Sequence, residues 1–180
     1  MMEKDILSGE KVHIRLMTNE DTDLIVKWRN NKRVRDNFIY REQFDRKTHE
    51  NWIKNHIEKG DVVQFIICEN ETDKPVGSVY FRDIDREADK RQAEYGIFIG
   101  EDSAIGKGYG NETALLAIRY AFDIMELDEI MLRVFKDNAP ARKSYEHAGF
   151  RACRELPKVE CSDGTCKDMI LMKIKRTEYE

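Results

Sequence analysis

Alternating glycines in one short segment carry the strongest chemical signal in this chain. Residues 105–111 read Ile-Gly-Lys-Gly-Tyr-Gly-Asn and lie between an expected strand and an amphipathic helix starting near Glu112. Glycines let the backbone turn sharply and approach an anion closely, while N–H groups and the positive end of the helix dipole face it. Such a loop can hold a pyrophosphate, although surface loops also use glycine simply to turn.

A second segment lies about 30 residues downstream. Asn138 begins an expected helix, Tyr145 follows seven residues later, and Gly149 and Phe150 close the segment. In this order the two segments, within residues 62–175, resemble the GNAT acetyltransferase superfamily. The family's first motif, Gln/Arg-x-x-Gly-x-Gly/Ala, departs here only at Ile105, which leaves the backbone cradle intact. The resemblance implies a GNAT fold, an α/β architecture with a mixed sheet of about six to seven strands flanked by about four helices.

The resemblance also implies two contacts with acetyl-CoA. Backbone amides of the glycine loop would bind its pyrophosphate, with Lys107 either adding charge at the rim or remaining solvated. The pantetheine arm would add, like a strand, to the edge of the strand before the loop. In that strand Gly96 fits a bulge or a close backbone approach, where an N–H could polarise the thioester carbonyl. The residues expected at the cofactor are Ile97, Phe98, Ile99, Ile105, Gly106, Lys107, Gly108, Tyr109, Gly110, Asn111, Asn138 and Tyr145.

Acetyl transfer needs a base and an acid. An amine has a pKa of about 10, so a group such as Glu94 must accept its proton, directly or through water. Glu94 could instead pair with Arg91 or be solvated. In the family a tyrosine at the place of Tyr145 protonates the leaving thiolate, and a phenol pKa near 10 exceeds the thiol's roughly 8.5. The alternative roles are a core tyrosine for Tyr145 and a simple helix cap for Asn138.

The amino-terminal third would supply the acceptor pocket. Its segment around Trp28 and His49 resembles the branch that acetylates nucleotide-linked amino sugars, with similarity to branches acting on spermidine or ribosomal-protein N-termini. Trp52 could stack on a sugar or base, and His49 could contact a hydroxyl or phosphate. Trp28, Trp52 and His56 could equally be packing residues. The residues expected at the substrate are Trp28, Arg29, Asn30, His49 and Trp52.

Three functional classes fit these patterns. The leading hypothesis is an acetyl-CoA-dependent N-acetyltransferase in which a small-molecule primary amine attacks directly in a ternary complex, without a metal. A coenzyme-A-binding sensor that has lost catalysis is the rival, because of Ile105. A structural α/β domain with a fortuitous glycine loop is the third. Edge-strand pairing could make a homodimer.

Composition narrows the class of protein. The 180 residues suit one domain, 1–180, and a net charge of −4 argues against broad nucleic-acid binding. The first five residues are too polar for a signal peptide and no apolar run reaches a membrane span, so we expect a cytoplasmic protein without membrane contact. The pair Cys161 and Cys166 lacks a nearby histidine, which favours reduced thiols over a zinc site.

Hydrophobic periodicity predicts the elements that position these groups. We expect strands at 11–16, 62–68, 76–81, 94–99, 129–134, 150–156 and 167–175, with an antiparallel meander from 62 to 99. Helices are expected after an N-cap at Asn19, at 46–59 between Asp45 and Gly60, after the glycine loop, and at 139–148. Residues 31–44 form a loop or short helix, and the charged segment 85–91 forms a loop or a flap beside the substrate. The helix after the glycine loop should bury Ala114, Leu115, Ile118, Ala121, Phe122 and Met125.

Overall fold

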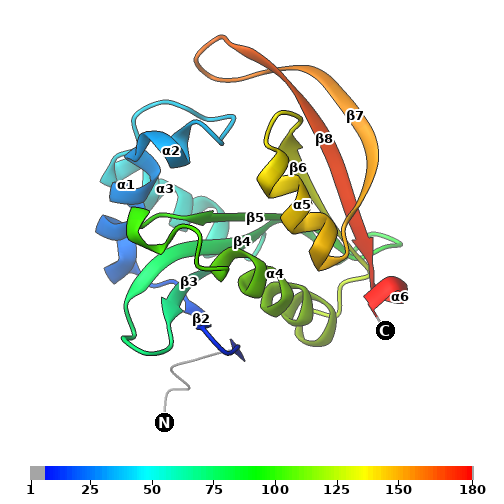
Figure 1. The fold of residues 1–180 in the computed structure, drawn as a ribbon, viewed down its shortest axis with the longest axis horizontal. Helices are drawn as coiled ribbons and strands as arrows, with labels where there is room; N and C mark the ends of the chain where they lie inside the picture. Colours follow the sequence, from blue (N-terminus) through cyan, green and yellow to red (C-terminus); the bar gives the residue numbers. More distant parts are fainter. Residues whose placement is uncertain (1–6, 180) are drawn as a thin grey trace.

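A computed structural model describes residues 7–179 of the chain. The strands of this part form one eight-stranded sheet in the order β1-β2-β3-β4-β5-β6-β8-β7, with helices packed against it (Figure 1). The strands are β1 (Leu7–Ser8), β2 (Val12–Leu16), β3 (Val63–Glu69), β4 (Pro75–Asp85), β5 (Gln92–Ile99), β6 (Glu129–Phe135), β7 (Arg151–Glu160) and β8 (Cys166–Lys175). The α-helices are α1 (Thr22–Asn30), α2 (Lys32–Arg35), α3 (Arg46–Trp52), α4 (Tyr109–Arg119), α5 (Ala139–Ala148) and α6 (Arg176–Tyr179). The polar residues 1–5 considered above lie outside the described residues.

The predicted mixed α/β sheet is confirmed, with one strand and two helices more in residues 7–179 than the sequence pattern gave. The additions are short, since β1 has two residues and α2 and α6 have four each. Elements of this length produce no periodic hydrophobic pattern. The antiparallel meander of β3, β4 and β5 is confirmed, and β5 is parallel to β6.

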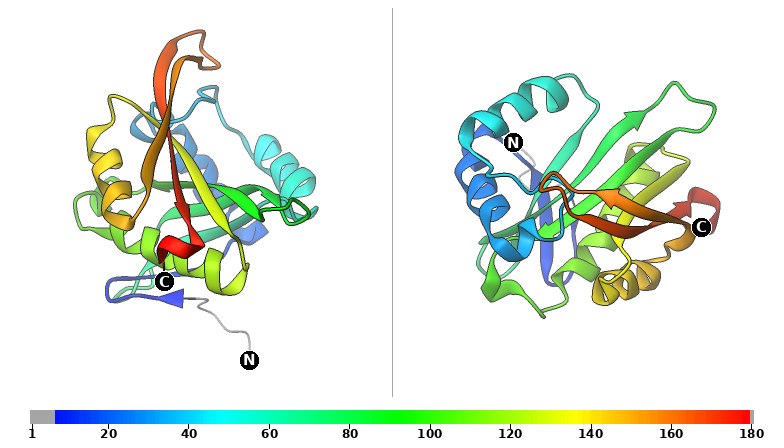
Figure 2. Two further views of the ribbon diagram at one scale, coloured as in Figure 1. Left: turned by 90° about the vertical axis from the view of Figure 1, so that its right-hand side faces the viewer. Right: turned by 90° about the horizontal axis from the view of Figure 1, so that it is seen from above.

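Helices cover both faces of the sheet, as the two further views show (Figure 2). Successive residues of a strand point to opposite faces. In β3, Phe65 and Ile67 belong to the core cluster that includes α4. Their neighbours Ile66 and Cys68 pack with Trp28 of α1 on the other face. The glycine-loop helix and the helices of the amino-terminal third therefore approach the sheet from opposite sides.

The start of α1 differs from the prediction. Asn19 lies within a short 3₁₀ turn and is not the cap of α1, which begins at Thr22. The preceding Thr18 caps that turn, and its backbone N–H donates to Asp21 Oδ2 at 2.8 Å. Asp21 is fixed in this position because the guanidinium of Arg15 binds both of its carboxylate oxygens.

Two details of α4 also differ from the prediction. The helix begins at Tyr109, three residues before the expected start, because Gly108 adopts a left-handed conformation (φ 81°) and acts as its N-cap. Leu115 is 52% exposed, whereas Leu116 and Ala117 are buried against the sheet. The last turn is a π-helical turn at Tyr120–Ile124, which changes the helical period that the prediction assumed.

The helix after Asp45 follows the prediction closely. The Asp45 side chain accepts a hydrogen bond from the Thr48 N–H at 2.7 Å, as an N-cap does. The helix continues through a π-helical turn at Ile53–Ile57, and Gly60 ends it with φ 81°. Within residues 7–179, no helix has the length and apolar character needed to cross a membrane.

The central sheet opens between β5 and β6. β4 stays paired with β5 as far as Ile99, whereas β6 pairs with β5 only at Gln92, Ala93 and Glu94. Beyond Glu94 the two parallel strands diverge (Figure 1). The β6-facing edge of residues 95–99 therefore has no strand partner, and its backbone groups face the opening.

Candidate active site

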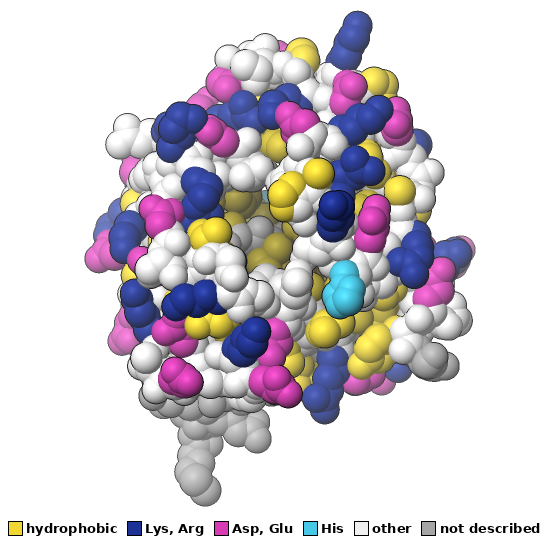
Figure 3. Space-filling view, viewed as in Figure 1, with side chains coloured by type: hydrophobic (Ala, Val, Ile, Leu, Met, Phe, Trp, Pro, Cys, Tyr) yellow, Lys and Arg dark blue, Asp and Glu magenta, His cyan; other side chains and the backbone are white. Residues whose placement is uncertain are grey.

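A cavity of about 960 Å³ lies at the opening between β5 and β6. Figure 3 shows a hollow near the centre of one face, with hydrophobic side chains inside and charged side chains around it. Residues of both sheet faces line the cavity: Tyr95 and Tyr145 pack on the α4 side, and Phe98 and Val34 on the α1 side. The cavity therefore runs from one face of the sheet to the other through the opening.

The glycine loop at the start of α4 has the geometry of an anion cradle. Gly106 and Gly108 both adopt left-handed backbone conformations, with φ of 78° and 81°. A Cβ placed on Gly106 or Gly110 would meet no atom within 4 Å, so the space beside the loop is open. The first N–H groups of a helix have no acceptor within it, which leaves those of α4 available for an anion. Ile105 is 49% exposed and lines the cavity.

Side chains of the loop are engaged with other parts of the protein. The Lys107 ammonium lies 3.5 Å from Glu69 Oε1, and the Tyr109 hydroxyl donates to the same oxygen at 3.0 Å. Asn111 Oδ1 accepts a hydrogen bond from the Ser144 hydroxyl of α5. The interpretation of Lys107 as a phosphate ligand is therefore less favoured than the cradle of backbone amides.

Gly96 is a site of close approach and not a bulge. The pairing of β4 with β5 passes without a register shift through Tyr80 and Gly96. A Cβ on Gly96 would lie 2.3 Å from the Tyr80 ring, so only glycine leaves room for this ring in the cavity. Gly96 also lies on the open edge of β5, next to Ile97, Phe98 and Ile99, which line the cavity.

Tyr145 of α5 lines the cavity beside Tyr95 and Phe150. Its ring contacts these two rings at centroid distances of 6.1 and 6.0 Å. Burial raises the pKa of the Tyr145 phenol above its ordinary value of 10, so the hydroxyl keeps its proton at neutral pH. Asn138 accepts from the Ala141 N–H at 3.3 Å and caps α5, so the capping interpretation holds, and it also lines the cavity.

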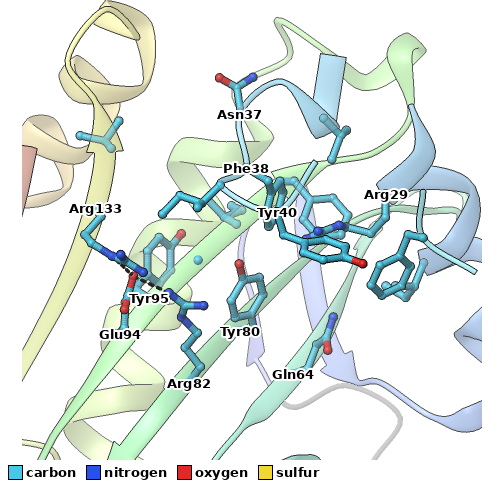
Figure 4. A pocket seen from close by; sticks show the side chains of 18 of the residues that line it. Arg29, Asn37, Phe38, Tyr40, Gln64, Tyr80, Arg82, Glu94, Tyr95 and Arg133 are labelled. Atoms are coloured by element: carbon cyan, nitrogen blue, oxygen red, sulfur yellow. Dashed lines mark hydrogen bonds and ion pairs between the residues drawn. The ribbon is translucent and has the colours of Figure 1, made fainter. Parts of the chain in front are cut away.

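Glu94 is held by two arginines on the floor of the cavity. Arg82 Nη2 and Arg133 Nε donate to Glu94 Oε1 at 3.0 and 2.9 Å (Figure 4). The alternative pairing with Arg91 is wrong, because Arg91 binds Asp128. None of residues 85–91 lines the cavity, so the structure favours a solvated loop over a flap beside the substrate.

Three of the five expected acceptor residues line the cavity, namely Arg29, His49 and Trp52. His49 is 1% exposed, and its Nδ1 lies 3.1 Å from the Thr22 hydroxyl. Burial lowers its pKa from 6.5 to about 4, so the imidazole is neutral at physiological pH. The Trp52 indole donates to Gln64 Oε1 at 3.2 Å, which fixes the ring at the wall of the cavity.

Two of the expected acceptor residues are structural. Trp28 is fully buried, its indole N–H donates to Glu101 at 2.8 Å, and it belongs to the core under α1. Asn30 forms two hydrogen bonds with the backbone of Phe44, at 2.6 and 2.8 Å, and so braces a loop. Trp28 is three residues after the buried Ile25 and shares its side of α1, so the indole turns toward the core and away from the cavity.

The sequence reasoning missed several side chains that form the acceptor side of the cavity. Tyr80 and Arg82 are two residues apart on β4 and thus point to the same face, and Arg133 approaches from β6. Polar and aromatic residues at every second position of a central strand were the available signal. The other missed residues lining this side include Phe38, Tyr40 and Gln64.

One wall of the cavity comes from the acceptor loop, defined here as residues 37–44. The tip of the β7–β8 hairpin holds this loop: the Ser162 N–H donates to Ile39 O at 2.9 Å, and the Arg41 N–H donates to the Ser162 hydroxyl at 2.7 Å. Arg41 also pairs with Asp163 at 3.3 Å. We call this set of contacts the hairpin clamp.

A sheet that splits between parallel strands, a helix N-terminus with an open glycine cradle and a tyrosine at the split define the acyl-CoA-dependent acetyltransferase class. The family model described as an acetyltransferase (GNAT) domain matches residues 11–151. This chain therefore belongs to the GNAT family and carries an N-acetyltransferase domain that uses acetyl-CoA.

Two relatives by sequence are named as acetyltransferases. Acetyltransferase PseH of Campylobacter jejuni is 27% identical over 134 residues, which are 74% of this chain and 79% of PseH. The N-acetyltransferase p20 of Bacillus licheniformis is 29% identical over 67% of this chain and 66% of its own length. Protein MJ1062 of Methanocaldococcus jannaschii is 27% identical over 84% of this chain, but the match spans only 30% of MJ1062.

Solved structures share the fold. The spermidine N-acetyltransferase of Vibrio cholerae, crystallised in complex with CoA and spermine, superposes with a TM-score of 0.86. The match covers 95% of this chain and 99% of that protein at 24% sequence identity. At this identity the comparison supports the GNAT fold and leaves the acceptor open.

Proposed function

We propose that this protein acetylates the primary amine of a small molecule in a ternary complex, and that the molecule is a nucleotide-linked amino sugar. The charge of the cavity lining carries the choice of acceptor: Arg29, Arg82 and Arg133 face it against the carboxylate of Glu94, and the fourth arginine of the lining, Arg33, is paired with Asp102. An amino sugar bearing phosphates complements this charge, whereas polycationic spermidine does not. Residues 1–180 would act as one cytoplasmic domain.

The cofactor fits the residues present. The open glycine loop would take the pyrophosphate on its backbone amides, and the unpaired edge of residues 95–99 would take the pantetheine arm. Acetyl-CoA supplies the acetyl group as a thioester when it is bound. An N–H near Gly96 would polarise the thioester carbonyl, as an oxyanion hole does.

Proton transfers fall to two side chains at the opening. The attacking amine must lose a proton as the new C–N bond forms, and Glu94 would accept it through a water. When the C–S bond breaks, the Tyr145 hydroxyl would donate its proton to the leaving thiolate. Burial raises the pKa of Tyr145, so its phenol carries a proton at neutral pH before the thiolate forms. The phenolate is neutralised again from solvent after the products leave.

Thiol release from acetyl-CoA tests the proposal against defined acceptors. We would compare UDP-linked amino sugars with a free amine, spermidine, and short peptides with a free N-terminus. We expect release with at least one sugar nucleotide and none with spermidine. The same sugar nucleotide with its amine already acetylated serves as the control, because it offers no nucleophile.

Two results would contradict this proposal in different ways. Rapid acetylation of spermidine would overturn the acceptor class while keeping the enzyme class. Tight acetyl-CoA binding without release with any amine of the panel would instead favour the sensor interpretation. Self-association also stays a prediction; a Vibrio cholerae spermidine N-acetyltransferase of the same fold, with a TM-score of 0.80, is described as dodecameric.

A further inference from the structure

Arg29 differs from the other three arginines of the cavity in its partners. Arg33 pairs with Asp102 at 2.9 Å, and Arg82 and Arg133 share Glu94 at 3.0 and 2.9 Å. Arg29 has no carboxylate partner within residues 7–179, and its Nε is a buried donor without an acceptor there. Arg29 is thus the arginine of the cavity lining whose guanidinium lacks an anionic partner within residues 7–179.

Aromatic rings hold the Arg29 guanidinium in a defined plane. Its central carbon lies 3.6 Å from the centroid of the Phe38 ring and 5.0 Å from that of Phe44. Figure 4 shows the side chain reaching from α1 toward Phe38 and Tyr40. Burial lowers the pKa of this guanidinium, and the Tyr80 phenol is its main electrostatic neighbour. The group is therefore desolvated and oriented before any ligand arrives.

A desolvated cation without a counter-charge destabilises a protein unless a ligand supplies the charge. A guanidinium presents a planar fork of N–H donors that matches the two oxygens of a carboxylate or phosphate. Stacking on Phe38 restricts the side chain, so less conformational entropy is lost on binding. Arg29 has the properties of a prepared anion site, and its α1 position puts it on the acceptor side of the sheet.

We propose that Arg29 binds the oxyanion, a phosphate or a carboxylate, carried by the acceptor. This inference rests on the proposed function, because it assigns the contact that selects the acceptor in the same cavity. Arg82 and Arg133 are already engaged with Glu94, which leaves Arg29 as the guanidinium that can form a two-point contact. The anion then fixes the molecule at one end while its amine faces the opening between β5 and β6.

Calorimetric titration can test this contact without turnover. The protein is first saturated with CoA, so that the glycine loop no longer binds added phosphates. UDP, inorganic pyrophosphate, malonate and uridine are then titrated separately. We expect an anion to bind and uridine not to bind. Binding of UDP or pyrophosphate assigns a phosphate, and binding of malonate alone assigns a carboxylate.

Variants then assign the contact to Arg29. In Arg29→Gln we expect the anion affinity to fall by roughly tenfold or more, since hydrogen bonds between charged groups are worth about 1.5–3 kcal/mol. Arg29→Lys should recover part of it, which also shows that the pocket remains folded. Arg33→Gln is the matched control, because it removes the same charge from a guanidinium that already has a partner in Asp102. Arg33→Gln should lower the anion affinity less than threefold.

The outcomes separate this inference from the proposed function. Equal anion affinity in the parent protein and Arg29→Gln, or no anion binding to the CoA-saturated protein, overturns the role of Arg29 whatever amine is acetylated. If Arg33→Gln loses as much anion affinity as Arg29→Gln, the anion responds only to the general positive charge of the cavity. That result also overturns the specific role of Arg29. Arg29-dependent anion binding without acetylation of any amine leaves the anion site standing and refutes the proposed function.

Discussion

The two sides of the cavity differ in the groups that line them: one presents backbone groups and the other presents side chains. On the donor side, the glycine loop and the open edge of β5 offer backbone groups, and the side chains of Lys107 and Tyr109 turn to Glu69. On the acceptor side, the walls are side chains of α1, α3, the acceptor loop and β4. A backbone surface depends on chain geometry, whereas a side-chain surface depends on which residues are present. The donor half can therefore be shared by a family, and under the proposed function the acceptor half would set specificity.

Tyr145 is the exception to this division, because in the proposed mechanism a side chain supplies the proton on the donor side. We expect Tyr145→Phe to lower turnover by about 100-fold or more, which is the usual contribution of a positioned general acid. Acetyl-CoA affinity should change little, since the backbone cradle is intact. Thiol-release kinetics and calorimetry with acetyl-CoA measure the two effects.

Tyr120→Phe is the matched control for this substitution. Tyr120 also lies on a helix and packs against an aromatic ring, that of Phe65, with centroids 4.8 Å apart, but it does not line the cavity. Removal of the Tyr120 hydroxyl should leave turnover close to that of the parent. Full activity in Tyr145→Phe would contradict the acid role and make the donor side a backbone surface throughout.

A neutral histidine should make the acceptor side sensitive to acid. Burial lowers the pKa of His49 to about 4, so between pH 6.5 and 4 the unfolded chain binds a proton that the folded chain does not. The stability that this group contributes is present above pH 6.5 and is lost as pH falls to about 4. The difference corresponds to about 3 kcal/mol.

Urea unfolding of the parent and of His49→Gln at pH 7 and pH 4.5 measures this effect. The parent should lose more free energy of unfolding than His49→Gln between these two pH values. Asp21, Glu50, Arg29 and Arg46 are the charged groups that influence His49, and all four remain in the variant. His147→Gln, at an exposed position on α5, should keep the parent's pH slope. An identical slope in His49→Gln would refute the neutral, buried imidazole.

The smallest effect we expect comes from the donor cradle itself. Gly108 has φ 81°, and forcing a residue with a Cβ into this conformation costs about 1–2 kcal/mol. Gly108→Ala should therefore lower the affinity for acetyl-CoA by roughly tenfold, because the loop relaxes from its native conformation. Gly60→Ala imposes the same strain at φ 81° far from the loop, so it should lose stability without losing donor affinity. Equal donor affinity in both variants would contradict the cradle.

The sequence was sufficient for the order of elements and for the backbone geometry of the glycine loop. Glycines and a helix cap act through local backbone geometry, which can be predicted from residues close together in the chain. The stop at Gly149 and the cap at Asn138 are examples, because each depends on a few neighbouring residues. The prediction of α4 was wrong only in its start and in the place of Leu115.

The acceptor half depends on residues far apart in the chain. Trp28 and Arg29 are adjacent in sequence, yet one is buried in the core and the other faces the cavity. Only the rotation of α1 on the sheet decides between them. The pairing of Glu94 with Arg133 joins residues 39 apart through the contact of β5 with β6, which no local pattern contains. The alternative of Arg91 was wrong for the same reason.

The hairpin clamp has a consequence for the order in which the protein is made. Arg41 and Ser162 are 121 residues apart, and a ribosome finishes the glycine loop and α5 before it reaches the hairpin tip. The acceptor loop can therefore take its final position only after residue 162 has been made. A chain that stops before β7 can already contain the whole donor half. The acceptor side is then completed after the donor half, because its wall depends on contacts that form only once the hairpin tip has been made.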